Sequence, residues 1–183
     1  MKKCILVGIA MSVVFSMTAI AAKGSETEIH EVSDTVTINW ENPKGYTDVR
    51  PANESRSRFL KRTLNQFDDI FADLGAKLPK GHTLDITVTN VDLAGQVWPQ
   101  QFVGLGHGSG DVRLIKDIDI PRMAFSYELK HQGDLVKNAE VNLKDMGFLT
   151  SGVRGFDSEP LRYEKHMLER WFGKEFSEQI AKQ

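Results

Sequence analysis

The chain has 183 residues, of which 40% are apolar and 26% are charged, and its formal charge is −2. This length fits a single domain, and the composition excludes a disordered chain, a collagen-like repeat and a disulfide-rich scaffold. The nearly balanced charge gives neither the basic footprint of a nucleic-acid-binding protein nor a polybasic membrane patch. We therefore expect a globular domain that has no nucleic-acid partner.

The first 22 residues have the pattern of an export signal. Lys2 and Lys3 precede an apolar run over residues 4–22, which ends in small residues before a polar stretch. This order is typical of a secretory signal peptide, and we predict cleavage after Ala21, with Ala22 as the alternative. Cleavage removes both lysines and no acid, so the formal charge falls from −2 to −4. The predicted location is periplasmic or secreted.

Cys4 is the only cysteine in the chain, and it lies at the start of that apolar run. After cleavage the chain has no thiol, which excludes a disulfide, a cysteine nucleophile and a cysteine-ligated zinc ion. No later apolar run approaches the ~18 residues that a membrane-spanning helix needs. We expect no transmembrane segment once the signal is removed.

The first half of the mature chain predicts a strand followed by a long helix. Residues 22–34 are polar and are predicted to be a flexible N-terminal segment. Residues 35–40 alternate between apolar and polar side chains, which is typical of a strand. A loop then leads to a predicted helix over about residues 55–77, with Asn53 or Ser55 as its N-cap. Its apolar side chains recur every three or four residues on one face, which we expect to pack on the core: Phe59, Leu60, Thr63, Leu64, Phe67, Ile70, Phe71 and Leu74.

The second half predicts consecutive strands and a final helix. Strands are expected over residues 83–91 and 112–115, separated by a long loop at 96–110, and a hairpin over 121–143 turns at 131–134. A helix begins near Pro160. The predicted fold class is α+β in the order β-α-β-β-β-β-α: a mainly antiparallel sheet of about four to five strands with two amphipathic helices on one face. Residues 35–183 form a single domain.

Three segments resemble a known family. They are 46–48 (Tyr-Thr-Asp), 88–95, which ends in Asp-Leu-Ala-Gly, and 162–165 (Arg-Tyr-Glu-Lys), with Leu-Pro at 78–79 and Trp-Phe at 171–172 as further matches. They are similar to domain of unknown function 3016, a family of small exported bacterial proteins, over nearly the whole mature chain. Asn90 departs from the pattern, which has an acidic residue there more often. The resemblance implies export and one domain, and it implies no activity.

Familiar catalytic and cofactor motifs are missing from the sequence. The glycine-rich segment 104–110 has neither dinucleotide-binding nor P-loop spacing, and Ser109 lacks the flanking glycines of a nucleophile elbow. A flexible surface connection is the favoured interpretation, and a mobile binding loop is the alternative. The five histidines show no spacing of two, three or four residues, so no metal site and no cofactor are expected.

Five residues remain as binding candidates. Asp92 ends a strand before Gly95, which favours a turn in which the carboxylate accepts backbone N–H groups. A shared role of Asp92 with Tyr46 and Trp98 is the alternative. Trp98 lies outside any apolar pattern, as interface anchors often do, although packing on the core is equally ordinary. Asp48 belongs to the first matching segment, and His107 is a candidate base.

Three functions are compatible with these observations. The leading hypothesis is a non-enzymatic envelope protein that binds an envelope protein or envelope component through its loops. The second is a hydrolase-like enzyme acting on an envelope substrate, in which Asp92, His107 and one further acid converge in one cleft. The third is a small-ligand carrier that uses the 104–110 loop as a lid.

Overall fold

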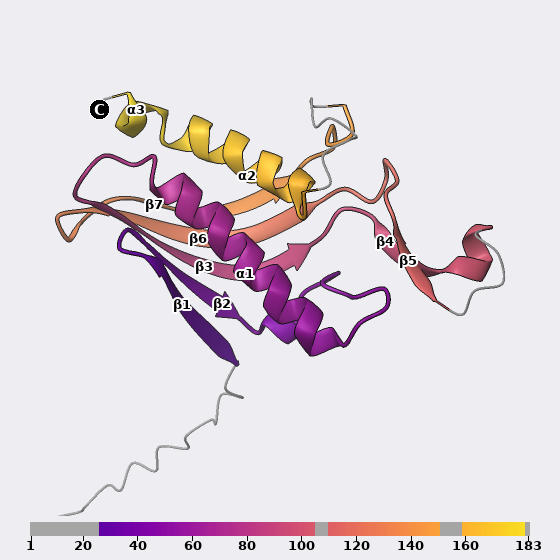
Figure 1. The fold of residues 1–183 in the computed structure, drawn as a ribbon. Coiled ribbons are helices and arrows are strands. Elements are labelled where there is room, and N and C mark those ends of the chain that lie inside the picture. The colour runs from indigo at the N-terminus through magenta and orange to yellow at the C-terminus, as the bar shows by residue number, and fades with distance from the viewer. Residues whose placement is uncertain (1–25, 105–109, 151–158, 182–183) are drawn as a thin grey trace, which may run out of the picture.

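A five-stranded sheet with helices on one face forms the body of the protein (Figure 1). The computed structural model describes residues 26–104, 110–150 and 159–181. The strands of the sheet, in spatial order, are β1 (Thr27–Ser33), β2 (Val36–Glu41), β3 (His82–Asp92), β6 (Arg122–His131) and β7 (Asp134–Lys144). The pair β2–β3 is parallel and the other neighbours are antiparallel. A parallel pair needs a long crossover, and the helix α1 (Arg56–Gly75) lies within it.

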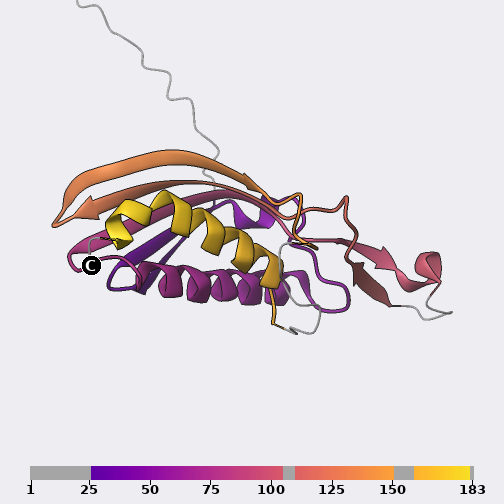
Figure 2. The same cartoon turned by 90° about the horizontal axis from the view of Figure 1, so that it is seen from above.

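The two long helices, α1 and α2 (Arg162–Glu175), lie on the same side of the sheet (Figure 2). The Ser55 hydroxyl caps α1 by accepting the Arg58 backbone N–H at 3.3 Å, as N-cap serines commonly do. A short helix, α3 (Ser177–Ile180), follows α2. The helix α1 buries Leu60, Thr63, Leu64, Phe67, Ile70, Phe71, Leu74 and Gly75, which confirms the predicted apolar face.

The core lies between the sheet and these helices. Phe125 of β6 links them, because its ring meets Phe71 of α1 edge-on at 6.3 Å between centroids and Trp171 of α2 at 4.8 Å. Trp40 of β2 and Phe67 are fully buried and lie 6.0 Å apart. Edge-on and tilted aromatic contacts at these distances are favourable. The opposite face of the sheet carries mainly polar side chains, with Ile29 of β1 exposed among them.

A second, two-stranded sheet extends beyond the end of the main sheet (Figures 1 and 2). It consists of β4 (Gln96–Pro99) and β5 (Asp111–Leu114), and the short helix η2 (Gln100–Val103) follows β4. We refer to β4, η2 and β5 together as the arm. Another short helix, η1 (Pro43–Gly45), follows β2.

The predicted α+β class, with a mainly antiparallel sheet and helices on one face, is confirmed. The hairpin is also confirmed, and Gln132 and Gly133 both have positive φ, as a tight two-residue turn requires. Three details differ. Residues 27–33, assigned to a flexible segment, form the edge strand β1; residues 96–99, assigned to a loop, form β4; and 111–114 pairs with β4 rather than with the main sheet.

Within the described residues, no helix has the length and apolar character needed to cross a membrane.

Candidate functional site

Arg113 of β5 joins the arm to the body of the protein. Its guanidinium donates to the Asp48 carboxylate at 2.8 Å and to the Gly95 carbonyl at 2.9 Å. It also donates to the carbonyls of Asp48, Arg50 and Ala94 at 3.0–3.3 Å. The planar fork of an arginine can serve several acceptors at once. One side chain therefore ties the arm to the segment after η1 and to the segment after β3.

A buried glutamate holds the same segment from the other side. The Glu164 side chain, in the first turn of α2, is only 3% exposed and accepts the Ala94 backbone N–H at 2.7 Å. The Gly95 N–H donates to the Asp119 carbonyl at 2.9 Å, so the chain entering the arm is bonded to the chain leaving it. We call Asp48, Ala94, Gly95, Arg113 and Glu164 the arm anchor.

Gly95 is required in the arm anchor by its backbone and by its surroundings. Its φ is +77°, a conformation that only glycine adopts readily. A Cβ at this position would overlap the Leu114 carbonyl oxygen and would lie 2.7 Å from the Ile115 side chain. The backbone of β5 therefore approaches the 92–95 segment more closely than any side chain would allow.

Asn53 adds a third connection, ahead of α1. Its side-chain amide donates to the Asp111 carbonyl at 2.7 Å and accepts the Asp111 N–H at 2.8 Å. This reciprocal pair imitates the bonding of a neighbouring strand, and it holds the start of β5.

Burial shapes the electrostatics of the arm anchor. Burial raises the pKa of Asp48 above its ordinary value, and the hydrogen bond and charge of Arg113 offset part of that rise. Burial also raises the pKa of Glu164, against the lowering effect of the Ala94 N–H. Desolvation disfavours the charged form of a carboxyl group. The arm anchor is thus a partly dehydrated polar network.

A cavity of about 750 Å³ lies beside the arm anchor, between α1, the start of α2 and the base of the arm. Four arginines border it, and three of them are already engaged. Arg62 pairs with Glu54 at 2.6 Å, and Arg162 donates to the Tyr163 hydroxyl at 2.7 Å. Arg113 is held by the contacts given above. The cavity is therefore a structural junction more than a prepared anion site.

The arm and the turn that follows it expose large apolar side chains. Phe102 of η2 is 72% exposed, Ile118 is 75% exposed, and Trp98 and Ile115 are each 37% exposed. Lys116 lies over the Trp98 ring at 4.7 Å from its centroid, a favourable cation–π contact. Exposed apolar side chains therefore occur from η2, at Phe102, to the turn after β5, at Ile118.

The structure separates the predicted binding residues. Tyr46 is buried in the core, where its hydroxyl donates to the Val88 carbonyl at 3.0 Å and burial raises its pKa. Asp48 lies in the arm anchor and Trp98 on the arm. The Asp92 carboxylate accepts from Arg122 at 2.9 Å; the alternative shared role with Tyr46 and Trp98 gains no support. His107 and the central part of the 104–110 loop lie outside the described residues.

Sequence reasoning missed Arg113, Glu164 and Phe102. Glu164 belongs to the matching segment 162–165, and that match is the signal that could have identified it. Arg113 lies in a short strand with no motif around it, and its acceptors are 18 to 65 residues away. Phe102 follows Pro99 within a stretch expected to be a loop.

Histidine contacts also arise that sequence spacing does not reveal. His82 and His131 face each other across β3 and β6, with ring centroids 4.6 Å apart. In the part of the chain that the structure describes, no three histidine, cysteine or acidic side chains are grouped so that they could hold a metal ion.

Fold and site together define a two-layer α+β protein with a β-arm held by a buried polar anchor. The chain belongs to the family described as Protein of unknown function (DUF3016), whose sequence model matches residues 34–174. This match confirms the resemblance stated from the sequence. No curated protein and no solved structure matches the chain.

Proposed function

We propose that this protein is an exported, non-enzymatic envelope protein that binds a partner protein through the arm. The observation that carries the proposal is the exposure of Phe102, Trp98 and Ile118 around an arm whose base is fixed by the arm anchor. An aromatic or aliphatic side chain held in place ahead of binding loses little conformational freedom when the complex forms. Such side chains are the usual energetic centres of protein interfaces.

The arm anchor supports this function because it fixes the orientation of the arm, although its buried polar groups lower the stability of the fold. Dehydrating Asp48, Arg113 and Glu164 is unfavourable, and an apolar junction of similar shape would not incur that penalty. Buried polar networks instead specify one arrangement, because each group must find its partner. A protein that needed only a stable core would gain little from this network.

The charges around the arm favour a protein partner over a lipid surface. Asp117 and Asp119 flank Ile118, and Asp111 begins β5. Among the cations, Arg113 is held in the arm anchor and Lys116 lies over Trp98. Carboxylates around the exposed apolar groups oppose insertion into an anionic bilayer. The complementary surface is an apolar patch bordered by basic side chains.

Export is supported by the order of residues at the N-terminus: basic residues, then an apolar run, then small residues before a polar stretch. The outer face of the arm would then meet partners in the cell envelope.

Photo-crosslinking in intact cells tests the proposal. A photoreactive amino acid replaces Phe102 and, in a separate strain, Asp69 on the exposed face of α1. We expect one discrete protein adduct from position 102 and none from position 69. The N-terminal peptide of the crosslinked chain should begin at Ala22, as cleavage after Ala21 requires.

Binding of the crosslinked partner is then measured with purified proteins. Phe102→Ser should weaken binding by about tenfold or more. Ile29→Ser is the matched control, because Ile29 is also an exposed apolar residue, at 67%, but lies on the edge strand β1. Equal binding by wild type and Phe102→Ser, or adducts of equal yield from both crosslinking positions, would contradict the proposal.

A further inference from the structure

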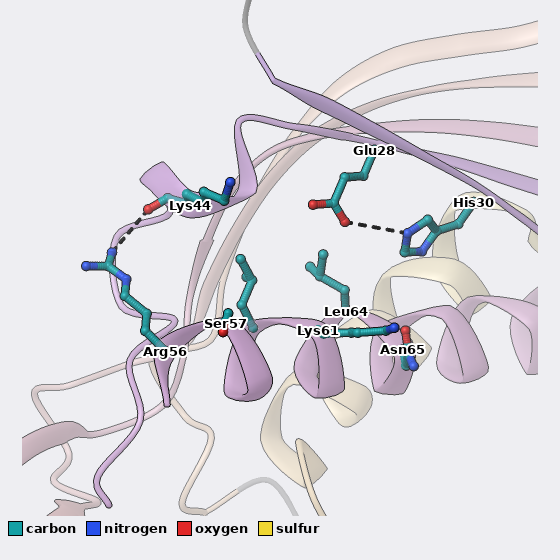
Figure 3. Close-up of a pocket in the computed structure, with 9 residues that line it drawn as sticks. Glu28, His30, Lys44, Arg56, Ser57, Lys61, Leu64 and Asn65 are labelled. Atoms are coloured by element: carbon teal, nitrogen blue, oxygen red, sulfur yellow. Dashed lines mark hydrogen bonds and ion pairs between the residues drawn. The ribbon is translucent and has the colours of Figure 1, made fainter. Parts of the chain in front are cut away.

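A larger cavity, of about 960 Å³, lies between the edge strand β1 and the first half of α1. Glu28 and His30 of β1 form its upper wall in Figure 3, Lys44 of η1 closes one end, and α1 forms its floor. This cavity is separate from the arm and from the arm anchor, with which it shares no lining residue.

The floor follows from helix geometry. Residues four apart lie above one another on a helix, so Arg56, Leu60, Leu64 and Asp68 form one row along α1. The two leucines are buried core residues whose side chains line the cavity. The row therefore presents an apolar strip with a cation at one end and a carboxylate at the other.

The carboxylate at the other end of the row is already engaged in hydrogen bonds. Asp68 accepts from His30 Nδ1 at 2.6 Å and from the Trp40 indole N–H at 3.3 Å. The His30 ring also meets Trp40 edge-on, with centroids 6.4 Å apart. These contacts fix the imidazole as a wall of the cavity, and Asp68 is engaged with it and is not among the lining residues.

The positive charge at the first end of the row is only partly engaged. Lys44 is paired with Glu26 at 2.6 Å, while Arg56 donates one of its N–H groups to the Lys44 carbonyl at 3.1 Å (Figure 3). Lys61 forms no ion pair with any other residue that the structure describes. The acid on the wall, Glu28, lies 3.8 Å from the His30 ring. Two cations, Arg56 and Lys61, are therefore available to a ligand, and they lie toward opposite ends of the apolar strip, because the Lys61 side chain extends toward Asn65 (Figure 3).

We propose that this cavity binds an amphipathic anion, an aliphatic chain that ends in a carboxylate or a phosphate. The chain lies on Leu60 and Leu64, and the anionic head lies at Arg56, while Lys61 adds positive charge at the other end of the strip. Burial of the chain provides most of the affinity, and the cations select the charge of the head. Carboxylates and phosphates both suit an arginine fork.

Titration of the purified protein with four compounds tests the site, with binding followed by amide chemical shifts. Octanoate and octyl phosphate carry the chain and an anionic head, octanol lacks the charge, and acetate lacks the chain. We expect saturable binding of at least one octyl anion, with shifts concentrated at residues 28–30 and 56–65. The stronger of the two identifies the head group. Octanol and acetate should bind at least about tenfold more weakly.

Two double variants test whether Arg56 and Lys61 select the charge of the head group. The double variant Arg56→Glu, Lys61→Glu should weaken binding of the preferred anion by about tenfold. The matched control, Arg58→Glu with Lys80→Glu, makes the same charge change at exposed positions outside the cavity. All four positions are exposed, and the unfolding midpoint of each variant verifies that it is folded. Absence of binding by both octyl anions, shifts located elsewhere, octanol binding as tightly as the anions, or equal losses in the two double variants would each overturn the proposal.

Discussion

Glu164 and Glu175 lie on the same helix, α2, yet the fold shifts their pKa values in opposite directions. Burial raises the pKa of Glu164 above its ordinary value of 4.5. Lys137, at 2.6 Å, and the Tyr127 hydroxyl, also at 2.6 Å, lower the pKa of Glu175. A raised native pKa means that the folded state holds the proton more tightly than the unfolded state. Glu164 therefore favours folding most at low pH, and that contribution is lost as the pH rises through its native pKa.

The two glutamates should consequently respond to pH with opposite signs. Burial penalises the charged form of Glu164, and Glu164→Gln removes that penalty, so we expect the stability of the variant relative to wild type to rise with pH through the native pKa of Glu164 and the gain to shrink as the pH falls. Glu175→Gln should lose stability at neutral pH, with the loss shrinking as the pH falls through the native pKa of Glu175. Urea unfolding at a series of pH values measures both. A Glu164→Gln difference that does not depend on pH would contradict the buried, proton-linked assignment.

At the scale of elements, the junction between the arm and the body depends on close approach of backbone. Gly95→Ala places a side chain on a residue with left-handed backbone, and the new Cβ overlaps Leu114. We expect the substitution to lower the free energy of unfolding by about 2–4 kcal/mol. Gly133→Ala is the matched control, because Gly133 also has positive φ, at +92°, but its Cβ would meet nothing within 4 Å.

The control should lose only the conformational cost, about 1 kcal/mol. Urea unfolding of both variants gives the comparison. Equal losses would show that the junction tolerates a side chain, and the packing described at Gly95 would then be wrong.

The elements that could be predicted have strong local signals. The apolar row of α1 recurs over five turns, and the β6–β7 hairpin turns at Gln132 and Gly133, where a tight turn needs positive φ. The strands β1 and β4 have weak signals. β1 is an edge strand with Glu28 and His30 on its inner face, and β4 has four residues and ends in Pro99. Pairing with β2 and β5 decides their structure, and the local periodicity of the sequence does not reveal that pairing.

The candidate site was accessible from the sequence only in part. Asp48 and Trp98 were singled out and lie in the arm anchor and on the arm. Arg113 could not be found, because its role depends on carbonyl groups brought together by the fold. Tyr46 illustrates the converse: an aromatic residue next to a loop is buried, and its hydroxyl bonds to the backbone of β3.

At the scale of the whole molecule, the fold keeps the two proposed binding regions apart. The arm extends from one end of the sheet, while the α1–β1 cavity opens along the edge of the sheet (Figures 1 and 3). The segment around the start of α1 contributes to both regions, because the first turns of α1 line the cavity and Asn53, ahead of the helix, holds β5. Arg56 and Lys61 lie outside the arm and the arm anchor, so changes at these residues should leave partner binding unchanged. Phe102 lies outside the cavity, so changes there should leave binding of the anion unchanged.

The proposed function depends on the arm anchor, which we propose orients the arm for binding. The most direct measurement is the crosslinking yield from position 102 in an Arg113→Met background, compared with the same probe in the wild-type background. Methionine keeps the apolar stem but removes every hydrogen bond to Asp48, Arg50, Ala94 and Gly95. We expect the adduct to fall by about tenfold while the protein is still exported and folded. An undiminished adduct from folded Arg113→Met protein would show that the arm binds without its anchor, and the role proposed for the arm anchor would then be wrong.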